Sequence, residues 1–177
     1  EKEYQVRIAE LVYEKFEYIV GHQPYGREKL RIKDFGGKLS RGEVLTEEQN
    51  AQYKQAHYRV EDISYLMKRF KHFKIAYLGD IESPNEENGE TNWYGALLEY
   101  TTESTDLAKR SGKVVEYPFD NKEGCIIETQ RIYFPDHYYF GQGKPVNQNN
   151  ILRFVRGEIV NFMDMNQDMY LEETFKG

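Results

Sequence analysis

The sequence has a single cysteine, Cys125, among 177 residues. One thiol cannot form a disulfide within the chain, and it cannot supply the repeated Cys and His ligands of a structural zinc site. No apolar run approaches the ~20 residues of a membrane-spanning helix. No signal peptide is visible, so a cytoplasmic location is the default expectation. Numbering begins at Glu1 rather than at Met, which leaves secretion after trimming open.

Motifs for phosphate and nucleophile chemistry are also missing. The chain has no Walker loop, no G-x-G-x-x-G and no G-x-S-x-G. The stretches GHQPYG and YFGQGKP contain glycines but show no strand–turn–helix context, so nucleotide chemistry is not expected. A net charge of −6 argues against nucleic acid as a partner. The sequence therefore predicts no cofactor, no metal, no nucleic-acid partner and no membrane partner.

Aromatic residues, in contrast, are abundant. They make up 15% of the chain, with 15 Tyr and 10 Phe, and hydrophobic residues make up 39%. Disordered chains contain few such residues, and this length suits one domain with a sizeable core. Since no repeat or linker is found, the sequence predicts a single domain over residues 1–177, with an inserted hairpin around 105–142.

The first half of the chain has the periodicity of helices. Apolar residues recur at steps of three and four over residues 3–20, which predicts a helix. Residues 28–45 carry Gly36-Gly37 between two short alternating runs, which predicts a small hairpin. Thr46 and Gln49 form a capping-box pattern that predicts a long helix over residues 47–71.

The second half has the alternation of strands. FKIAYLGDI and NWYGALLEYTTE predict one antiparallel pair, and KVVEYPFD and GCIIETQRIYF predict a second. NILRFV and EIVNFMDM predict a closing pair that turns tightly at Arg156-Gly157. Helices packed on one face of such a meander predict an α+β domain.

The end of the chain resembles a known family. The segment GKPVNQNNILRFVRGEIVNFMDMNQ, residues 143–167, is similar to the closing hairpin of the SnoaL-like branch of the NTF2-like superfamily. The matching residues are Gly157, Glu158, Ile159, Val160, Asp164 and Gln167. The chain departs at Met163, where the family has an aromatic residue, and at Asn161-Phe162, where it has Glu-His. The resemblance implies a curved antiparallel sheet wrapped around the N-terminal helices as an NTF2-like cone with a cavity.

Asp164 is the first candidate for chemistry, because the resemblance implies a general acid/base at this position. Such a base needs an apolar pocket, where desolvation raises the pKa of the carboxyl group. The alternative is a solvated strand-end aspartate, since carboxylates are seldom buried. A calcium loop starting at Asp164 is excluded, because its sixth and twelfth positions are Met169 and Phe175 instead of Gly and Glu.

Aromatic residues on the predicted strands supply the other candidates. A tyrosine hydroxyl such as that of Tyr94 could polarise a carbonyl, and His137 could act as a general base beside a carboxylate. The predicted ligand pocket is lined by Trp93, Tyr100, Tyr133, Phe154 and Phe162. The alternative is that the aromatic residues fill the sheet core and that His137 lies in a surface loop.

The sequence thus predicts an NTF2-like domain whose cavity binds a small hydrophobic molecule. If the domain is an enzyme, we expect cofactor-free isomerase, cyclase or dehydratase chemistry, with Asp164 as base and a Tyr as hydrogen-bond donor. The alternative is a non-catalytic interaction or dimerisation module that uses the aromatic sheet face, and a homodimer is expected. A third reading is an unrelated α+β domain whose last hairpin matches by chance.

Overall fold

The computed structural model describes residues 2–80, 93–102, 113–114, 124–134 and 144–162. The helices of this part are α1 (Lys2–Lys15), α2 (Tyr25–Ser40), α3 (Glu47–Arg69) and α5 (Lys144–Leu152). The strands are β1 (Tyr18–Gly21), β2 (Phe73–Asp80), β3 (Trp93–Thr101), β4 (Lys113–Val114) and β5 (Cys125–Tyr133). They form one sheet in the order β1-β2-β3-β5-β4. The predicted α+β class is confirmed.

Pairing in the sheet is mixed. β1 runs parallel to β2, and the chain between them forms α2 and α3. β2 with β3, β3 with β5, and β4 with β5 are antiparallel. The two predicted antiparallel pairs that follow residue 73 are therefore confirmed, whereas the parallel β1 was not predicted.

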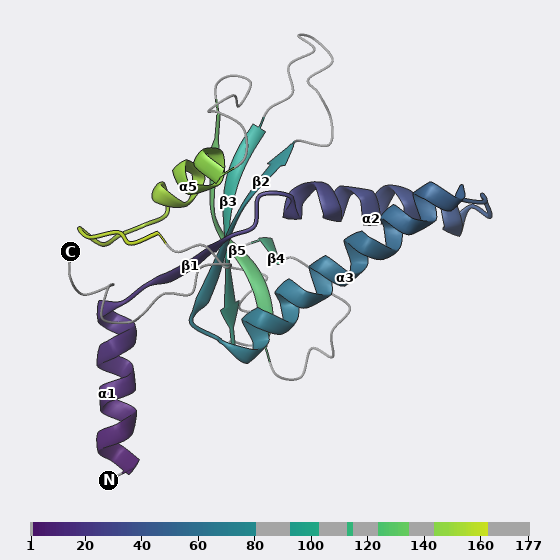
Figure 1. Ribbon diagram of the computed structural model, residues 1–177. Helices are drawn as coiled ribbons and strands as arrows, with labels where there is room; N and C mark the ends of the chain where they lie inside the picture. Colours follow the sequence, from purple (N-terminus) through teal and green to yellow (C-terminus); the bar gives the residue numbers. More distant parts are fainter. Residues whose placement is uncertain (1, 81–92, 103–112, 115–123, 135–143, 163–177) are drawn as a thin grey trace.

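Helices cover both faces of the sheet (Figure 1). Along β2, Ile75 and Tyr77 face a core shared with α2 and α3, and Ala76 and Leu78 face the opposite side, where α5 and Phe154 pack. This alternation is the period of two that a strand buried on both faces requires. The predicted cone was an antiparallel sheet wrapped around the N-terminal helices. The observed sheet instead contains a parallel strand pair and has helices on both of its faces.

Helix α3 begins where the sequence predicts. The Thr46 backbone N–H donates to the Gln49 side chain at 3.1 Å, and the Gln49 backbone N–H donates to the Thr46 hydroxyl at 3.2 Å. This reciprocal capping box supplies partners for two amide groups that the first turn cannot satisfy itself. The helix ends at Arg69 after burying an apolar stripe made of Ala56, Val60, Ile63 and Met67.

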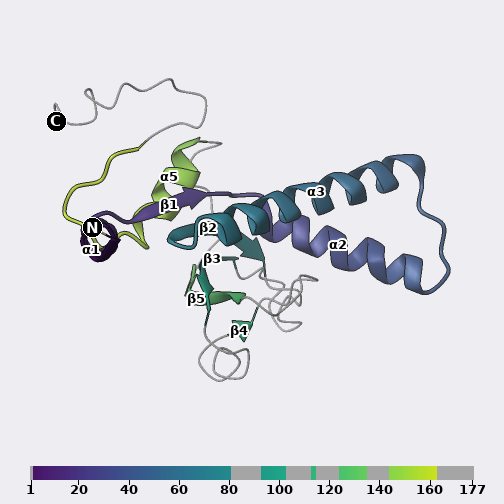
Figure 2. The same cartoon turned by 90° about the horizontal axis from the view of Figure 1, so that it is seen from below.

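The predicted hairpin over residues 28–45 is wrong, because this stretch lies mainly in α2. Gly36 and Gly37 lie inside the helix, and Gly36 faces Tyr53 of α3. Phe35 is buried against α3, with its ring 6.4 Å from that of Tyr53. Burial of Phe35 outweighs the poor helix propensity of the two glycines. Figure 2 shows α2 and α3 side by side, extending far beyond the sheet.

Helix α1 is shorter than the predicted helix over residues 3–20, because residues 18–21 leave it to form β1. Its apolar side chains remain largely exposed, as at Tyr4 and Leu11, and α1 points away from the sheet in Figure 1. Within the described part of the chain, no helix is both long enough and apolar enough to cross a membrane.

The predicted closing hairpin is also wrong. Lys144–Leu152 form α5, and residues 153–162 contain no strand on either side of Arg156-Gly157. The physical reason is a spacing of four: Val146, Asn150 and Phe154 are all buried against the sheet, as one face of a helix and its continuation require. The remaining residues of the resembling segment, 163–167, lie outside the described residues.

Candidate functional site

The parallel strands define an edge of the sheet at which a ligand could bind. β1 and β2 run in the same direction, so their carboxyl ends, Gly21 and Asp80, point the same way, and α2 starts four residues after β1. In Figure 1 the start of α2 and the end of β2 lie at one end of the sheet, and α5 lies on the sheet face opposite α2. In open α/β sheets, ligands bind outside the carboxyl ends of the strands. We call this region the carboxyl edge.

The turn from β1 into α2 is firmly held. The His22 backbone N–H donates to the Ala76 carbonyl at 2.9 Å, which extends the β1–β2 ladder, and the Tyr25 N–H donates to the His22 carbonyl at 3.1 Å. Tyr25 is fully buried, with its ring 5.0 Å from that of Tyr77 and edge-on to it. The first residue of α2 is therefore fixed against the sheet.

Gly26 lets the start of α2 lie directly on the backbone of β2. A Cβ atom at this position would overlap the Leu78 carbonyl oxygen and lie 2.9 Å from the Gly79 Cα atom. Both neighbours are backbone atoms of a central strand, so they cannot move aside as a flexible side chain could. Only glycine fits between the helix and the strand here.

Glu28, in the first turn of α2, is a buried carboxylate with 1% exposure. Arg59 of α3 donates from Nη1 to Glu28 Oε1 at 2.7 Å. His22 Nε2 lies 3.1 Å from Glu28 Oε2, and since an ionised carboxylate only accepts, Nε2–H is the donor. We call His22, Glu28 and Arg59 the Glu28 cluster. Its two donors offset the cost of removing the carboxylate from water.

Helix α5 attaches to the other face through two asparagine amides. Asn147 donates from Nδ2 to the carbonyl of Gly21 at 3.0 Å, and Asn150 donates from Nδ2 to the carbonyl of Tyr77 at 3.3 Å. Asn150 is fully buried, and its Oδ1 atom occupies the space that a Cβ atom on Gly95 would need. The carboxyl edge is thus held from both faces.

A second polar group lies on the sheet face where β3 and β5 pair. Arg131 donates to both oxygens of Glu128, at 2.6 and 2.7 Å, and the Tyr77 hydroxyl donates to Glu128 at 3.0 Å. The Arg131 guanidinium lies 3.8 Å from the centre of the Tyr94 ring. We call these four residues the Glu128 cluster.

The electrostatics of the Glu128 cluster favour a structural role. Burial first, and then the neighbouring Tyr94 and Glu128, raise the pKa of the Tyr77 hydroxyl far above its usual range, so the phenol stays neutral. Burial would lower the pKa of Arg131, but its hydrogen bonds to Glu128 and the nearby charges raise it on balance. Arg131 therefore stays charged, and it keeps both Glu128 oxygens engaged in hydrogen bonds within the sheet.

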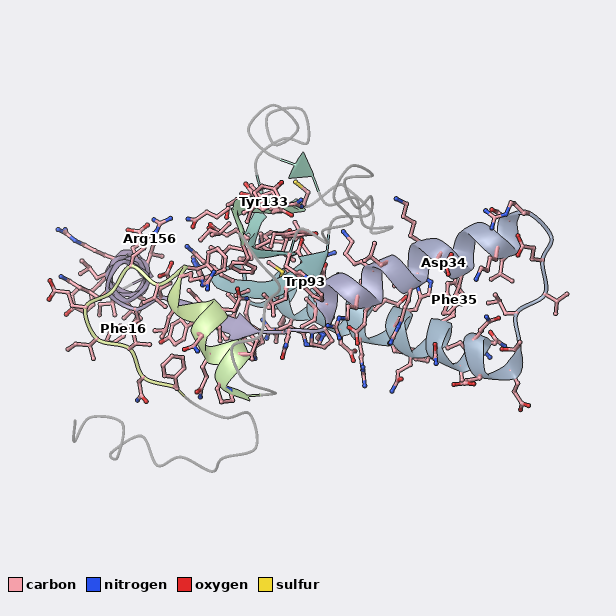
Figure 3. All side chains as sticks on the ribbon, turned by 90° about the horizontal axis from the view of Figure 1, so that it is seen from above. Phe16, Asp34, Phe35, Trp93, Tyr133 and Arg156 are labelled. Atoms are coloured by element: carbon pink, nitrogen blue, oxygen red, sulfur yellow. The ribbon has the colours of Figure 1, made fainter. Side chains whose placement is uncertain are left out.

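The structure brings three of the predicted site residues together at one end of the sheet. Tyr94 and Tyr133 are cross-strand partners with ring centres 6.1 Å apart, and Trp93 precedes Tyr94 with Arg27 of α2 5.4 Å from its ring. Figure 3 shows Trp93 and Tyr133 on the sheet, far from the distal part of α2. Tyr100 lies at the opposite end of β3 and is not part of this group.

The remaining predicted site residues are separate from these. Phe154 is buried on the α5 face against Ala76 and Leu97, and Phe162 is partly exposed beyond α5. Asp164 and His137 lie outside the described residues. Among the described residues, no group of three His, Cys, Asp or Glu side chains could hold a metal ion.

Sequence reasoning missed the residues that shape the carboxyl edge. The stretch GHQPYG was set aside for lack of a strand–turn–helix context, yet it joins β1 to α2 and provides that context. His22, Gly26 and Glu28 all lie within it or directly beyond it. A helix prediction over residues 25–40 would have revealed it, and Gly36-Gly37 prevented that prediction.

Comparison with known proteins identifies relatives. A family model described as "1,3-beta-glucan synthase component" matches residues 43–177. The chain is 30% identical over 162 residues to callose synthase 12 of Arabidopsis thaliana, which covers 92% of this chain and 6% of that protein. It is 34% identical over 116 residues to the 1,3-beta-glucan synthase component FKS1 of Aspergillus niger, covering 66% of this chain and 5% of that protein. The chain thus spans only a small fraction of its curated relatives.

These matches correct the sequence-based assignment. The resemblance to the SnoaL-like and NTF2-like proteins is wrong, because the synthase family covers most of the chain, including the segment that carried the resemblance. The predicted isomerase, cyclase or dehydratase activity and the predicted interaction or dimerisation module are wrong with it. The short motif around Gly157 and Asp164 was too degenerate to identify a family.

Proposed function

Because the chain belongs to the 1,3-beta-glucan synthase component family, we propose that it is a section of an enzyme that builds 1,3-β-glucan by glucosyl transfer. The observation that carries this proposal is the match over residues 43–177, which includes α3, β2 to β5 and α5. Since the chain spans about 6% of its plant relative, we assign it one part of the reaction: binding of the glucosyl donor.

The chemistry of glucan synthesis states what such a section must hold. The 3-hydroxyl of the growing chain attacks C1 of an activated glucose, a C1–O3 bond forms, and the bond from C1 to the leaving group breaks. The acceptor hydroxyl gives its proton to a base, and the leaving group departs with the bonding electron pair. A phosphorylated leaving group is anionic, so the donor site needs groups that favour negative charge.

The carboxyl edge has features that suit an anionic donor. The positive end of the α2 dipole lies here, and the exposed Arg27 is on its first turn. Gly26 keeps this helix start against the sheet, and Arg59 neutralises the nearby Glu28 carboxylate, which would otherwise repel an anion. These observations support a donor site at the start of α2.

The direct test uses the longest natural chain that contains these residues, produced in a host that makes no 1,3-β-glucan of its own. We expect labelled glucose from an activated donor to enter a polymer that an enzyme specific for 1,3-β-glucan degrades completely. A polymer that resists this enzyme, or no polymer beside an active reference synthase, would contradict the proposed function.

The placement of the donor site is tested by a matched pair of variants. Arg27→Gln should raise the KM for the donor about tenfold, because one charge-assisted contact is lost. Arg31→Gln, one turn further along the exposed side of α2, is the control and should leave KM unchanged. Equal behaviour of the two variants would place the donor elsewhere.

A further inference from the structure

We infer that Glu28 is a positioning residue that sets donor affinity by fixing the β1–α2 turn, an inference that rests on the proposed function. Its carboxylate joins two elements that approach the carboxyl edge from different directions. One oxygen accepts from Arg59 in α3, and the other accepts from His22 in the turn. Glu28 itself belongs to α2, so this one side chain connects the turn, α2 and α3.

The geometry makes the turn depend on this contact. The backbone of His22 is part of the β1–β2 ladder, and its side chain turns back towards α2 to reach Glu28. Its ring also packs edge-on to Tyr25, with centres 6.2 Å apart. The contact of His22 with Glu28 is the side-chain hydrogen bond by which this turn is held to α2. Without it, the turn keeps its backbone hydrogen bonds to the start of α2, such as that from the Tyr25 N–H to the His22 carbonyl, but loses this side-chain hydrogen bond between His22 and the first turn of the helix.

Arg59 holds the carboxylate in place for this role. Its guanidinium is partly exposed, whereas the carboxylate is buried, so the charged pair extends from the core to the surface. Removal of Arg59 would leave an uncompensated buried charge whose only remaining partner in the described structure is His22. The turn would then rearrange around the unpaired Glu28 carboxylate and would no longer be held in one position by it.

Positioning predicts a particular kinetic signature in the complete enzyme. Glu28→Gln retains the size of the side chain and removes its charge, and Arg59→Met removes the partner. Each should raise the KM for the glucosyl donor at least fivefold and leave kcat within twofold, because a loosened turn weakens donor binding without touching the reacting atoms. Arg59→Lys, which keeps the charge, should restore most of the affinity.

The control is Arg41→Met, which breaks the exposed Arg41–Glu43 pair at the far end of the same helix pair and should leave both constants unchanged. Stabilisation of the wild type and variants by donor alone, measured as a thermal shift, gives a readout without turnover. The inference is supported if Glu28→Gln and Arg59→Met reduce this shift and Arg41→Met does not.

Two outcomes overturn the inference. A fall in kcat with unchanged KM would mean that the cluster only maintains folded protein, and unchanged constants would mean that the turn is held without it. Failure of the proposed function looks different, because the wild type would then make no 1,3-β-glucan at all. The product identifies the activity, and the ratio of KM values tests Glu28.

Discussion

The two ends of helix α2 are built differently. At the sheet end, Tyr25, Gly26 and Glu28 are all buried, and the helix touches the β2 backbone directly. At the far end, Leu39 is largely exposed, and a Cβ atom at Gly37 would have only the end of the Arg41 side chain within reach. Figure 3 shows Phe35 between the two helices, well away from Trp93 on the sheet.

The difference indicates which end of α2 tolerates substitution least. Near the carboxyl edge, close backbone contact and a buried ion pair fix the start of α2, as a preformed binding site requires. Far from the sheet, α2 and α3 hold each other mainly through Phe35 and its neighbours. Substitutions should therefore be costly at the first end and mild at the second.

The largest effect is expected for Gly26→Val. Its side chain would overlap the backbone of Leu78 and Gly79, so α2 must move off the sheet. We expect a loss of about 3 kcal/mol or more in the free energy of unfolding and loss of donor binding in the complete enzyme. Thermal unfolding of the 177-residue chain measures the first effect. A change under about 1 kcal/mol would show that this contact is not tight.

The next effect is expected for Asn150→Ala, which tests the same edge from the other face. The variant removes a fully buried side chain and its hydrogen bond to the Tyr77 carbonyl. We expect a loss of about 2 kcal/mol. Asn149→Ala, at the exposed neighbouring position, is the control and should lie within about 0.5 kcal/mol of the wild type. Similar losses for both variants would contradict the observed orientation of α5.

The sequence predicts those elements whose signals are local. The capping box of Thr46 and Gln49 involves residues three apart, and the start of α3 follows from it. Alternation within a single run likewise predicts β2 and β3. These features need no knowledge of distant partners.

Other elements depend on contacts that the sequence does not display. Gly36-Gly37 is a turn signal by itself, and only the neighbouring α3 makes that stretch a helix. Of the three buried positions Val146, Asn150 and Phe154, the middle one is polar. The burial of Asn150 depends on its hydrogen bond to the Tyr77 carbonyl, 73 positions away. Glu28 is similar, because its partner Arg59 lies 31 positions away. From the sequence alone, a buried polar residue is predicted to lie at the surface, because its hydrogen-bond partner is not known.

A smaller loss is expected at the far end for Thr46→Ala. The hydroxyl that accepts from the Gln49 amide is removed, and the first turn of α3 loses one cap. We expect a loss of about 1 kcal/mol, or a fall of about 2–4 °C in Tm for a chain of this size. Thr46→Ser, which keeps the cap, should stay close to the wild type. Equal melting of the two variants would show that the far end of the helix pair contributes nothing to cooperative unfolding.

The smallest effect is expected for Gly37→Ala, and its sign separates the observed helix from the hairpin that the sequence predicted. In α2 the new methyl group would have only Arg41 Nη1 nearby, at 3.6 Å, an ordinary contact with a flexible side chain. Alanine favours a helix over glycine, partly because it restricts the unfolded chain, so stability should rise by about 0.5–1 kcal/mol. In a tight hairpin turn, Gly36-Gly37 would need positive φ angles, and alanine would instead destabilise. Gly42→Ala is the reference for that case, since Gly42 has a φ of 79° in the connection between α2 and α3. Thermal melting should therefore move upwards for Gly37→Ala and downwards for Gly42→Ala, and a fall for both would restore the hairpin.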